Sequence, residues 1–292
     1  MKVTEKNYYS RLDKFLRKTH ENIPLNAIYK LIRKGFVKVN GKRVKTPSFK
    51  LEIGDEVEIF TDISKYNRKT NYKLRPIPME LDVIYEDSNL LIINKKPGIP
   101  IHPGKGVHIA TIIEGLMYYG NQNNFEPYLV HRLDKHTSGV LIVAKNPEAA
   151  RKMGKLISNR EVEKEYITLV AGKISRSGEI KLSLDNLEAV TYYKPLNLYE
   201  TELGVFTKLC VKIKTGRKHQ IRRHFSLINH PVVGDDLYGK RKLNHEFRRL
   251  YGLKRYFLHC KRMAFYFNNK FININTEIPE DLKIVLKKLE NK

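Results

Sequence analysis

Hydrophobic residues near the N-terminus recur at the three- and four-residue spacing of amphipathic helices. Two such sets flank Pro24: Leu12, Phe15 and Leu16 before it, then Ile28, Leu31 and Ile32 after it. The pattern then changes to alternation, first at 37–39 before the Asn40–Gly41 turn signal and again over 51–59. We therefore expect two short helices followed by short strands.

This first unit should end near residue 62. The segment 63–79 is polar, has no sustained hydrophobic period and carries two prolines near its end, which is typical of a linker. The pattern predicts a first domain over 1–62, a linker over 63–79 and a larger domain over 80–292.

Short β patterns separated by Gly, Pro and Asn dominate the chain from residue 80 onward. The predicted strands are 81–86, 90–94, 139–144, 164–171 and 208–214, and the predicted helices are about 109–119, 147–158 and 217–229. Asn146 and Pro147 form a good start for the second helix. Because the order is not a regular β–α–β alternation, we predict an α+β protein: a small helix–helix–β domain, then a mixed β-rich domain with peripheral helices.

Charge changes the picture more than composition does. Lys and Arg number 55 against 31 Asp and Glu, which gives a formal net charge of +24 and favours a polyanionic partner such as nucleic acid. The two cysteines are too few for a disulfide framework, and no apolar run reaches the roughly 18 residues of a membrane helix. The N-terminus also lacks the hydrophobic core of a signal peptide. We expect a cytoplasmic protein with no membrane contact.

The densest cluster of reactive side chains is the loop 130–139, VHRLDKHTSG. Taken alone, Arg132 and Asp134 could be only a structural ion pair. His131 and His136 have no Cys or carboxylate at zinc-site spacing, so no metal is expected. Ser138 lacks the elbow pattern of a serine nucleophile.

The order of motifs along the chain gives this loop its meaning. The blocks LLIINKKPGIPIHPG, VHRLDKHTSGVLIVAKN, EKEYITLVAGKI, TGRKHQIRRHFSLINHPVVGDDLYG and FLHCKRMAF together resemble the RluA family of pseudouridine synthases. The segments RLDKFLRK, LIRKGFVKVNGKRVK and LEIGDEVEIF resemble the S4 RNA-binding domain. The chain departs from the family pattern at Lys96, Asn229 and Cys260, none of which is a catalytic position.

The resemblance implies the fold of the larger domain and a set of roles. It makes Asp134 the catalytic aspartate, Tyr166 the active-site tyrosine and Arg217 the basic residue that pairs with the aspartate. Arg132 would help displace the target base, and Arg222, with His102 and Gln220, would contact substrate or support structure. The implied reaction is isomerisation of uridines in large-subunit (23S) rRNA, which needs no cofactor.

The basic residues of the first domain should contact RNA phosphates, which position a protein without reading sequence. The candidates are Arg11, Lys14, Arg33, Lys34 and Lys38. We expect a monomer whose partner is large-subunit rRNA, free or in a ribosomal precursor. Three alternatives stay open: a non-catalytic ribosome-binding factor, a metal-dependent hydrolase on the His-rich loops, and an enzyme that modifies tRNA or another rRNA uridine.

Overall fold

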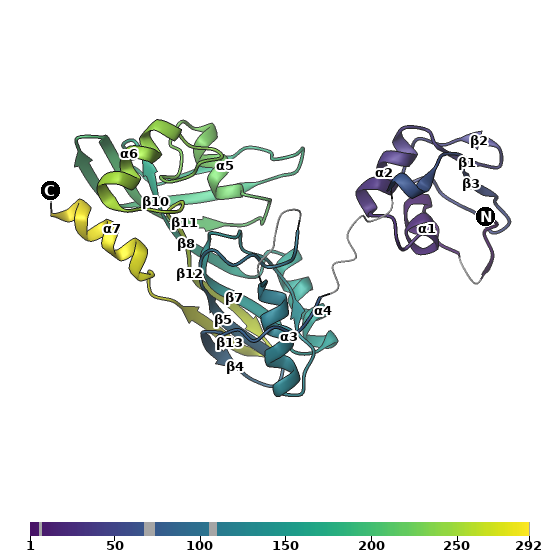
Figure 1. Cartoon of the computed structure of the whole chain (residues 1–292), viewed down its shortest axis with the longest axis horizontal. Coiled ribbons are helices and arrows are strands. Elements are labelled where there is room, and N and C mark those ends of the chain that lie inside the picture. The colour runs from purple at the N-terminus through teal and green to yellow at the C-terminus, as the bar shows by residue number, and fades with distance from the viewer. Residues whose placement is uncertain (6–7, 67–73, 105–109, 292) are drawn as a thin grey trace. The chain divides into compact units, whose positions relative to one another are not determined.

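A computed structural model describes residues 1–5, 8–66, 74–104 and 110–291. The chain divides into two compact units, Met1–Lys73 and Leu74–Lys292 (Figure 1). Within the linker predicted over 63–79, Ile63–Tyr66 form a 3-10 helix whose Ile63 and Tyr66 pack on the first unit's core, and 67–73 lie outside the described residues. None of the helices that the structure describes is long and apolar enough to span a membrane.

The first unit has the helix–helix–β order that the hydrophobic pattern predicts. Helices α1 (Leu12–Thr19) and α2 (Leu25–Arg33) precede a three-stranded antiparallel sheet in the order β2-β1-β3. Its strands are β1 (Val37–Val39), β2 (Lys42–Arg43) and β3 (Val57–Ile59). Leu12, Phe15 and Leu16 are buried together with the apolar face of α2, so the predicted core residues do form one core. The alternation over 51–59 yields a strand only at its end.

The second unit is built on one large mixed sheet. Its continuous path is β4-β5-β7-β12-β8-β11-β10-β9, with β13 paired to β12 and β6 paired to β7. Only the β7–β12 pairing is parallel among the strands that the structure describes. The bounds are β4 (Val83–Glu86), β5 (Leu90–Lys95), β6 (Tyr128–Leu129), β7 (Ser138–Ala144), β8 (Glu163–Ala171), β9 (Gly178–Lys181), β10 (Val190–Thr201), β11 (Gly204–Ile213), β12 (Leu258–Phe267) and β13 (Lys270–Asn275).

Helices pack around this sheet. They are α3 (Ile112–Gln122), α4 (Pro147–Ser158), α5 (Gln220–Leu227), α6 (Arg241–Tyr251) and α7 (Glu280–Glu290). The α4 helix begins as predicted, because the Asn146 side chain accepts a hydrogen bond from the Ala149 amide and proline occupies the first turn. In Figure 1, α5 and α6 lie over the half of the sheet that holds β10 and β11, and α3 and α4 lie over the half that holds β5 and β7.

Two buried clusters hold the second unit together. One joins β5 and β7 to the inner residues of β8 and β12, and every residue of β7 is buried. The other joins α6 and α7 to β11 through Phe206, Phe247 and Val285. The larger cluster fixes the strand ends from which the catalytic candidates project.

Some predicted boundaries were wrong. The helix expected at 217–229 starts at Gln220 and ends at Leu227, and the helix expected at 109–119 runs from Ile112 to Gln122, with residue 109 outside the described residues. Helices α6 and α7 were not predicted at all. The shift at α5 matters most, because it leaves Arg217 ahead of the helix and places Arg222 within its first turns.

Candidate active site

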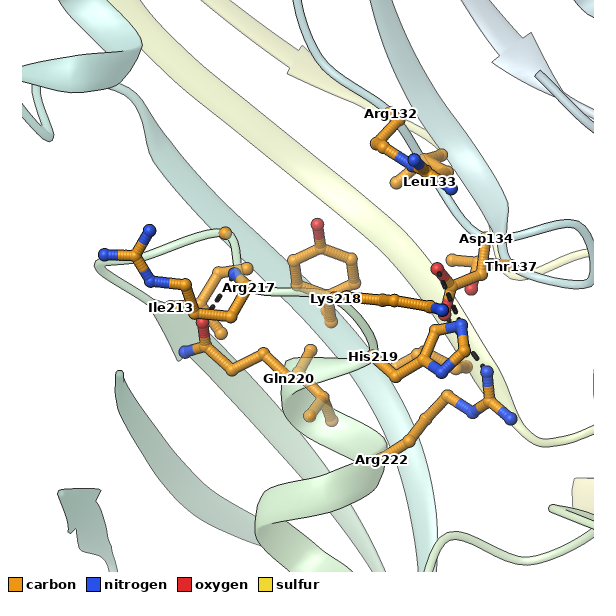
Figure 2. A pocket seen from close by; sticks show the side chains of 14 residues that line it. Arg132, Leu133, Asp134, Thr137, Ile213, Arg217, Lys218, His219, Gln220 and Arg222 are labelled. Atoms are coloured by element: carbon orange, nitrogen blue, oxygen red, sulfur yellow. Dashed lines mark hydrogen bonds and ion pairs between the residues drawn. The ribbon is translucent and has the colours of Figure 1, made fainter. Parts of the chain in front are cut away.

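Asp134 lies in the loop between β6 and β7, at the edge of a cavity of about 300 Å³ in the second unit. The loop turns back on itself because the Thr137 amide donates to the Asp134 carbonyl oxygen at 3.1 Å. The Asp134 side chain is 20% exposed, so the carboxylate is sheltered yet reachable from the cavity. Figure 2 shows Asp134 facing the start of α5 across this cavity.

Arg222 provides the cation beside Asp134. Its Nη1 donates to Asp134 Oδ2 at 3.2 Å, and its Nε and Nη2 donate to the two carboxylate oxygens of Asp235 at 2.6 and 2.9 Å (Figure 2 shows the contact with Asp134). Its guanidinium also lies 4.1 Å from the centre of the Tyr256 ring. A planar guanidinium that is fixed on one carboxylate and stacked on an aromatic ring can present its remaining donor to the second carboxylate in one geometry.

Asp235 is the residue that fixes this geometry. It is fully buried and accepts hydrogen bonds from the amides of Leu237 and Tyr238 as well as from Arg222. Although burial opposes the charge of Arg222, the hydrogen bond and the charge of Asp235 raise the pKa of Arg222 above its ordinary value. The arginine is therefore a permanent cation next to Asp134.

His219 is the second basic group at the carboxylate. Its Nε2 lies 3.7 Å from Asp134 Oδ1, and its Nδ1 is 2.9 Å from the Tyr238 hydroxyl. The residue precedes α5 in the left-handed conformation, with φ of 54°. Burial lowers the pKa of His219 while Asp134 acts in the opposite direction, so the ring is a polar neighbour of the carboxylate more than a second cation.

Two buried cations hold the Asp134 loop from the side opposite the cavity. Lys95 Nζ donates to the Lys135 carbonyl oxygen at 3.1 Å, and burial, followed by the charge of Arg255, lowers the pKa of Lys95 to about 7. Arg255 donates to the His136 carbonyl oxygen at 2.9 Å and is paired with Asp281 of α7 at 2.7 Å. The backbone on the C-terminal side of the carboxylate is thus tied to β5 and to the C-terminal helix.

Tyr166 of β8 lines the same cavity as Asp134. It is 7% exposed, and burial followed by its neighbour Cys260 raises the pKa of Tyr166 well above its ordinary value. The phenol is therefore protonated at neutral pH. It can offer a flat ring and a hydroxyl, but it is not an ionised base.

Comparison with known proteins decides what this cavity belongs to. Residues 89–227 match the family model described as RNA pseudouridylate synthase, and residues 10–57 match the S4 domain. Over 99% of its length the chain is 33% identical to the ribosomal large subunit pseudouridine synthase C of Buchnera aphidicola and 34% identical to the protein of the same name from Escherichia coli, covering 96% of each. The chain belongs to the RNA pseudouridylate synthase family.

Solved structures agree with this assignment at the level of the fold. The human RNA pseudouridylate synthase domain containing 4 superposes with a TM-score of 0.60 at 23% identity, over 71% of this chain and 92% of that one. The human RNA pseudouridylate synthase domain containing 1 gives 0.56 at 25% identity, over 68% and 84%. The pseudouridine synthase described here is thus an isomerase with an N-terminal S4 domain and a mixed, mainly antiparallel catalytic sheet.

The expected pairing of Arg217 with Asp134 was wrong. Arg217 lines the synthase cavity, but its Nε donates to the Glu188 carbonyl oxygen at 3.0 Å and its guanidinium points away from Asp134 in Figure 2. The ion-pair partner is Arg222, which the sequence had assigned only to substrate contact or support. The physical reason is the start of α5 at Gln220, which turns the two arginines of the motif in different directions.

The remaining predicted residues are distributed around the same opening of the synthase. Arg132 is exposed and lines the cavity, and His102 and His136 line an adjoining cavity of about 410 Å³ that also contacts Asp134. Gln220 is buried as a structural residue, since its side chain accepts from Thr215 and donates to the Val190 carbonyl oxygen.

Sequence reasoning missed several supporting residues. His219 was considered only as a metal ligand, and Asp235, Lys95 and Arg255 were not singled out. His219 and Asp235 lie inside the motif blocks TGRKHQIR and VVGDDLYG, so their position was the available signal.

The metal and serine alternatives find no support in the geometry. No group of three potential metal-ligating side chains occurs among the residues that the structure describes. His131 accepts a hydrogen bond from the Ile142 amide, and burial lowers the pKa of His131 to about 3. Ser138 is buried between His259 and Arg255, away from the cavity.

The five predicted RNA contacts of the S4 domain differ in their availability. Arg11 binds the buried Asp13 through two hydrogen bonds, and Lys38 lies 3.8 Å from Glu58. The other three are exposed and have no ion-pair partner among the described residues: Lys14, Arg33 and Lys34. Lys14 also lines a surface groove of about 520 Å³ with Arg17 and Lys18.

Proposed function

We propose that this protein converts specific uridines of large-subunit rRNA to pseudouridine, with Asp134 as the catalytic carboxylate. The observation that carries the proposal is the Asp134–Arg222 ion pair at the edge of an accessible cavity that Tyr166 also lines. The relatives that match over almost the whole chain are named for the large ribosomal subunit. Their names are the reason for choosing this RNA.

The reaction breaks the bond between uracil N1 and ribose C1′ and forms a bond between C5 and C1′. The C5 proton is lost and N1 gains one, so atoms and electrons balance without an oxidant or cofactor. An anionic oxygen near C1′ can form a covalent intermediate or remove a sugar proton, and the Asp134 carboxylate supplies it. Arg222 keeps that carboxylate ionised and oriented.

Tyr166 and Arg132 would act on the target nucleotide itself. A protonated phenol in the cavity wall can stack on uracil and relay a proton near C5. The uridine must leave the RNA stack, at a cost of about a few kcal/mol, and the exposed Arg132 is available to occupy the space it vacates. Arg217, which binds Glu188 and still lines the cavity, would contact substrate.

The S4 domain would dock the enzyme on folded RNA through the exposed Lys14, Arg33 and Lys34, with Arg11 and Lys38 as weaker contacts because each has a carboxylate partner. All residues that line the cavity come from one chain, which supports action as a monomer. An rRNA substrate would place the activity in the cytoplasm.

Pseudouridine mapping of large-subunit rRNA tests the proposal. Cells that lack the protein should lose pseudouridine at specific positions, and expression of the wild type should restore them. Asp134→Asn should restore none of them while binding rRNA as tightly as the wild type, because the amide keeps the shape of the side chain and loses its charge.

Asp236→Asn is the matched control. Asp236 is an exposed aspartate of the same unit that pairs with Arg248, and this variant should restore modification fully. Restoration by Asp134→Asn would support a non-catalytic ribosome-binding factor instead. Loss of pseudouridine only from tRNA would retain the chemistry and reject the proposed RNA.

A further inference from the structure

A second cavity, of about 380 Å³, lies next to the catalytic one and shares Arg132, Tyr166 and Arg217 with it. Basic side chains dominate its polar lining, and no Asp or Glu lines it among the described residues. The additional cations are Arg160, Lys164 and Lys214. Arg160 is already paired with Glu188 at 2.5 Å, and Lys214 is exposed.

Lys164 differs from these other cations because it is buried. It is 8% exposed and lies two residues before Tyr166 on β8, so both side chains project from the same face of the strand into the cavity wall. Among the residues that the structure describes, no carboxylate is within ion-pair distance of its Nζ, and none contributes to its titration.

The groups nearest to Lys164 cannot balance its charge. Cys260 interacts with it electrostatically, but burial raises the pKa of Cys260 to about 12, so its thiol is neutral. His131 is also a neighbour, and burial lowers the pKa of that imidazole to about 3. Glu163 and Glu165, which flank Lys164 on β8, pair with Arg262 and Lys212 instead.

A buried cation without a counter-ion is costly, and a fold retains it at an accessible cavity most readily when a ligand supplies the missing negative charge. RNA brings such charges along its whole backbone. The cavity adjoins the one that would hold the target uridine, so a phosphate close to that nucleotide is within reach of both.

We propose that Lys164 binds a backbone phosphate of the RNA substrate next to the target uridine. Arg132, Lys214 and Arg217 line the rest of this phosphate subsite. The inference rests on the proposed function, since it names how that substrate is held. It assigns to Lys164 a role in substrate binding, separate from the chemistry of Asp134.

Single neutral phosphates test the contact directly. A fragment of large-subunit rRNA that the wild type modifies would carry one methylphosphonate at each position flanking the target uridine in turn. The wild type should bind one of these RNAs more weakly than the unmodified RNA. Lys164→Met should bind the unmodified RNA more weakly and show no further loss with that same methylphosphonate, because the two changes remove one interaction.

Salt dependence and stability provide independent measurements. In Lys164→Met the slope of log affinity against log salt concentration should be shallower by about 0.7 to 0.9, the value of one phosphate contact. The free variant should unfold at a higher temperature than the wild type, because methionine removes the uncompensated charge and keeps the length of the chain. A purely structural lysine would give the opposite stability change and an unaltered slope.

Lys208→Met is the matched control. Lys208 is a half-buried lysine of β11 that lines neither cavity, so this variant should keep the wild-type slope and methylphosphonate pattern. Equal sensitivity of wild type and Lys164→Met to every methylphosphonate would overturn the inference. Failure of the proposed function is distinguishable, because the wild type would then form no pseudouridine in the unmodified fragment.

Discussion

Neighbouring residues of α5 show how strongly the surroundings set the value of a charge. Arg222 binds Asp235, which is fully buried, whereas Arg223 binds Asp185, whose side chain is 67% exposed. Both contacts are bidentate arginine–aspartate pairs. Only the first is shielded from water, so only the first leaves a buried carboxylate unpaired when the arginine is removed.

Arg222→Met should therefore lower the free energy of unfolding of the catalytic unit by about 3–5 kcal/mol. Arg223→Met should lower it by less than about 1 kcal/mol, because water screens the exposed pair. Calorimetric unfolding of the two full-length variants measures the difference. Equal losses would show that Asp235 does not depend on Arg222 for its charge.

The residue scale is also where prediction from sequence reached its limit. The motifs located the loop of Asp134 and the strand of Tyr166, and both side chains line one cavity. The choice between Arg217 and Arg222 depended on where α5 begins, and His219 in a left-handed conformation sets that start. A local backbone conformation of this kind leaves no periodic signal in the sequence.

Elements with a clear local signal were predictable, and those that depend on distant partners were not. The α4 helix has its own cap and amphipathic face, and its bounds match the prediction. The basic sequence of α6 obscured an apolar stripe that includes Phe247 and Tyr251, which pack against β11 and α7. The parallel pairing of β7 with β12 joins segments far apart in the chain.

Gly139 is the position at which that pairing constrains the sequence. It has φ of +112°, and a Cβ atom there would lie 2.1 Å from the Cys260 carbonyl oxygen on β12. Gly139→Ala should therefore destabilise the catalytic unit severely and reduce activity, since Asp134 lies in the loop that leads into β7.

Gly154→Ala is the control for the element scale. Gly154 is exposed within α4, and a Cβ atom added there would meet no neighbouring atom within 4 Å, so alanine should stabilise the helix by about 0.5–1 kcal/mol. Thermal unfolding of both variants tests the contrast. A neutral effect of Gly139→Ala would mean that β7 and β12 can separate without loss of the fold.

At the scale of the whole molecule, the net charge of +24 predicts that RNA binding depends steeply on salt. The exposed groove of the S4 domain contains Lys14, Arg17 and Lys18. Replacing all three with Gln should reduce the slope of log affinity against log salt by about 2 if each contacts one phosphate of a single strand. Filter binding of the same rRNA fragment over a range of salt concentrations measures this slope.

A second triple variant separates contact from general attraction. Lys283, Lys287 and Lys288 of α7 carry the same charge on the catalytic unit, and replacing them with Gln should leave the slope nearly unchanged. Equal reductions in both variants would mean that the protein attracts RNA by its overall field, without a defined docking surface on the S4 domain.

The ion pair between Arg255 and Asp281 has a consequence for any shortened form of this protein. A fragment that stopped before α7 would contain every motif residue and still lose the counter-ion of a cation that is 5% exposed beneath the Asp134 loop. The stranded guanidinium would then compete with Arg222 for nearby carboxylates. Possession of the complete set of sequence motifs would therefore not guarantee a working enzyme.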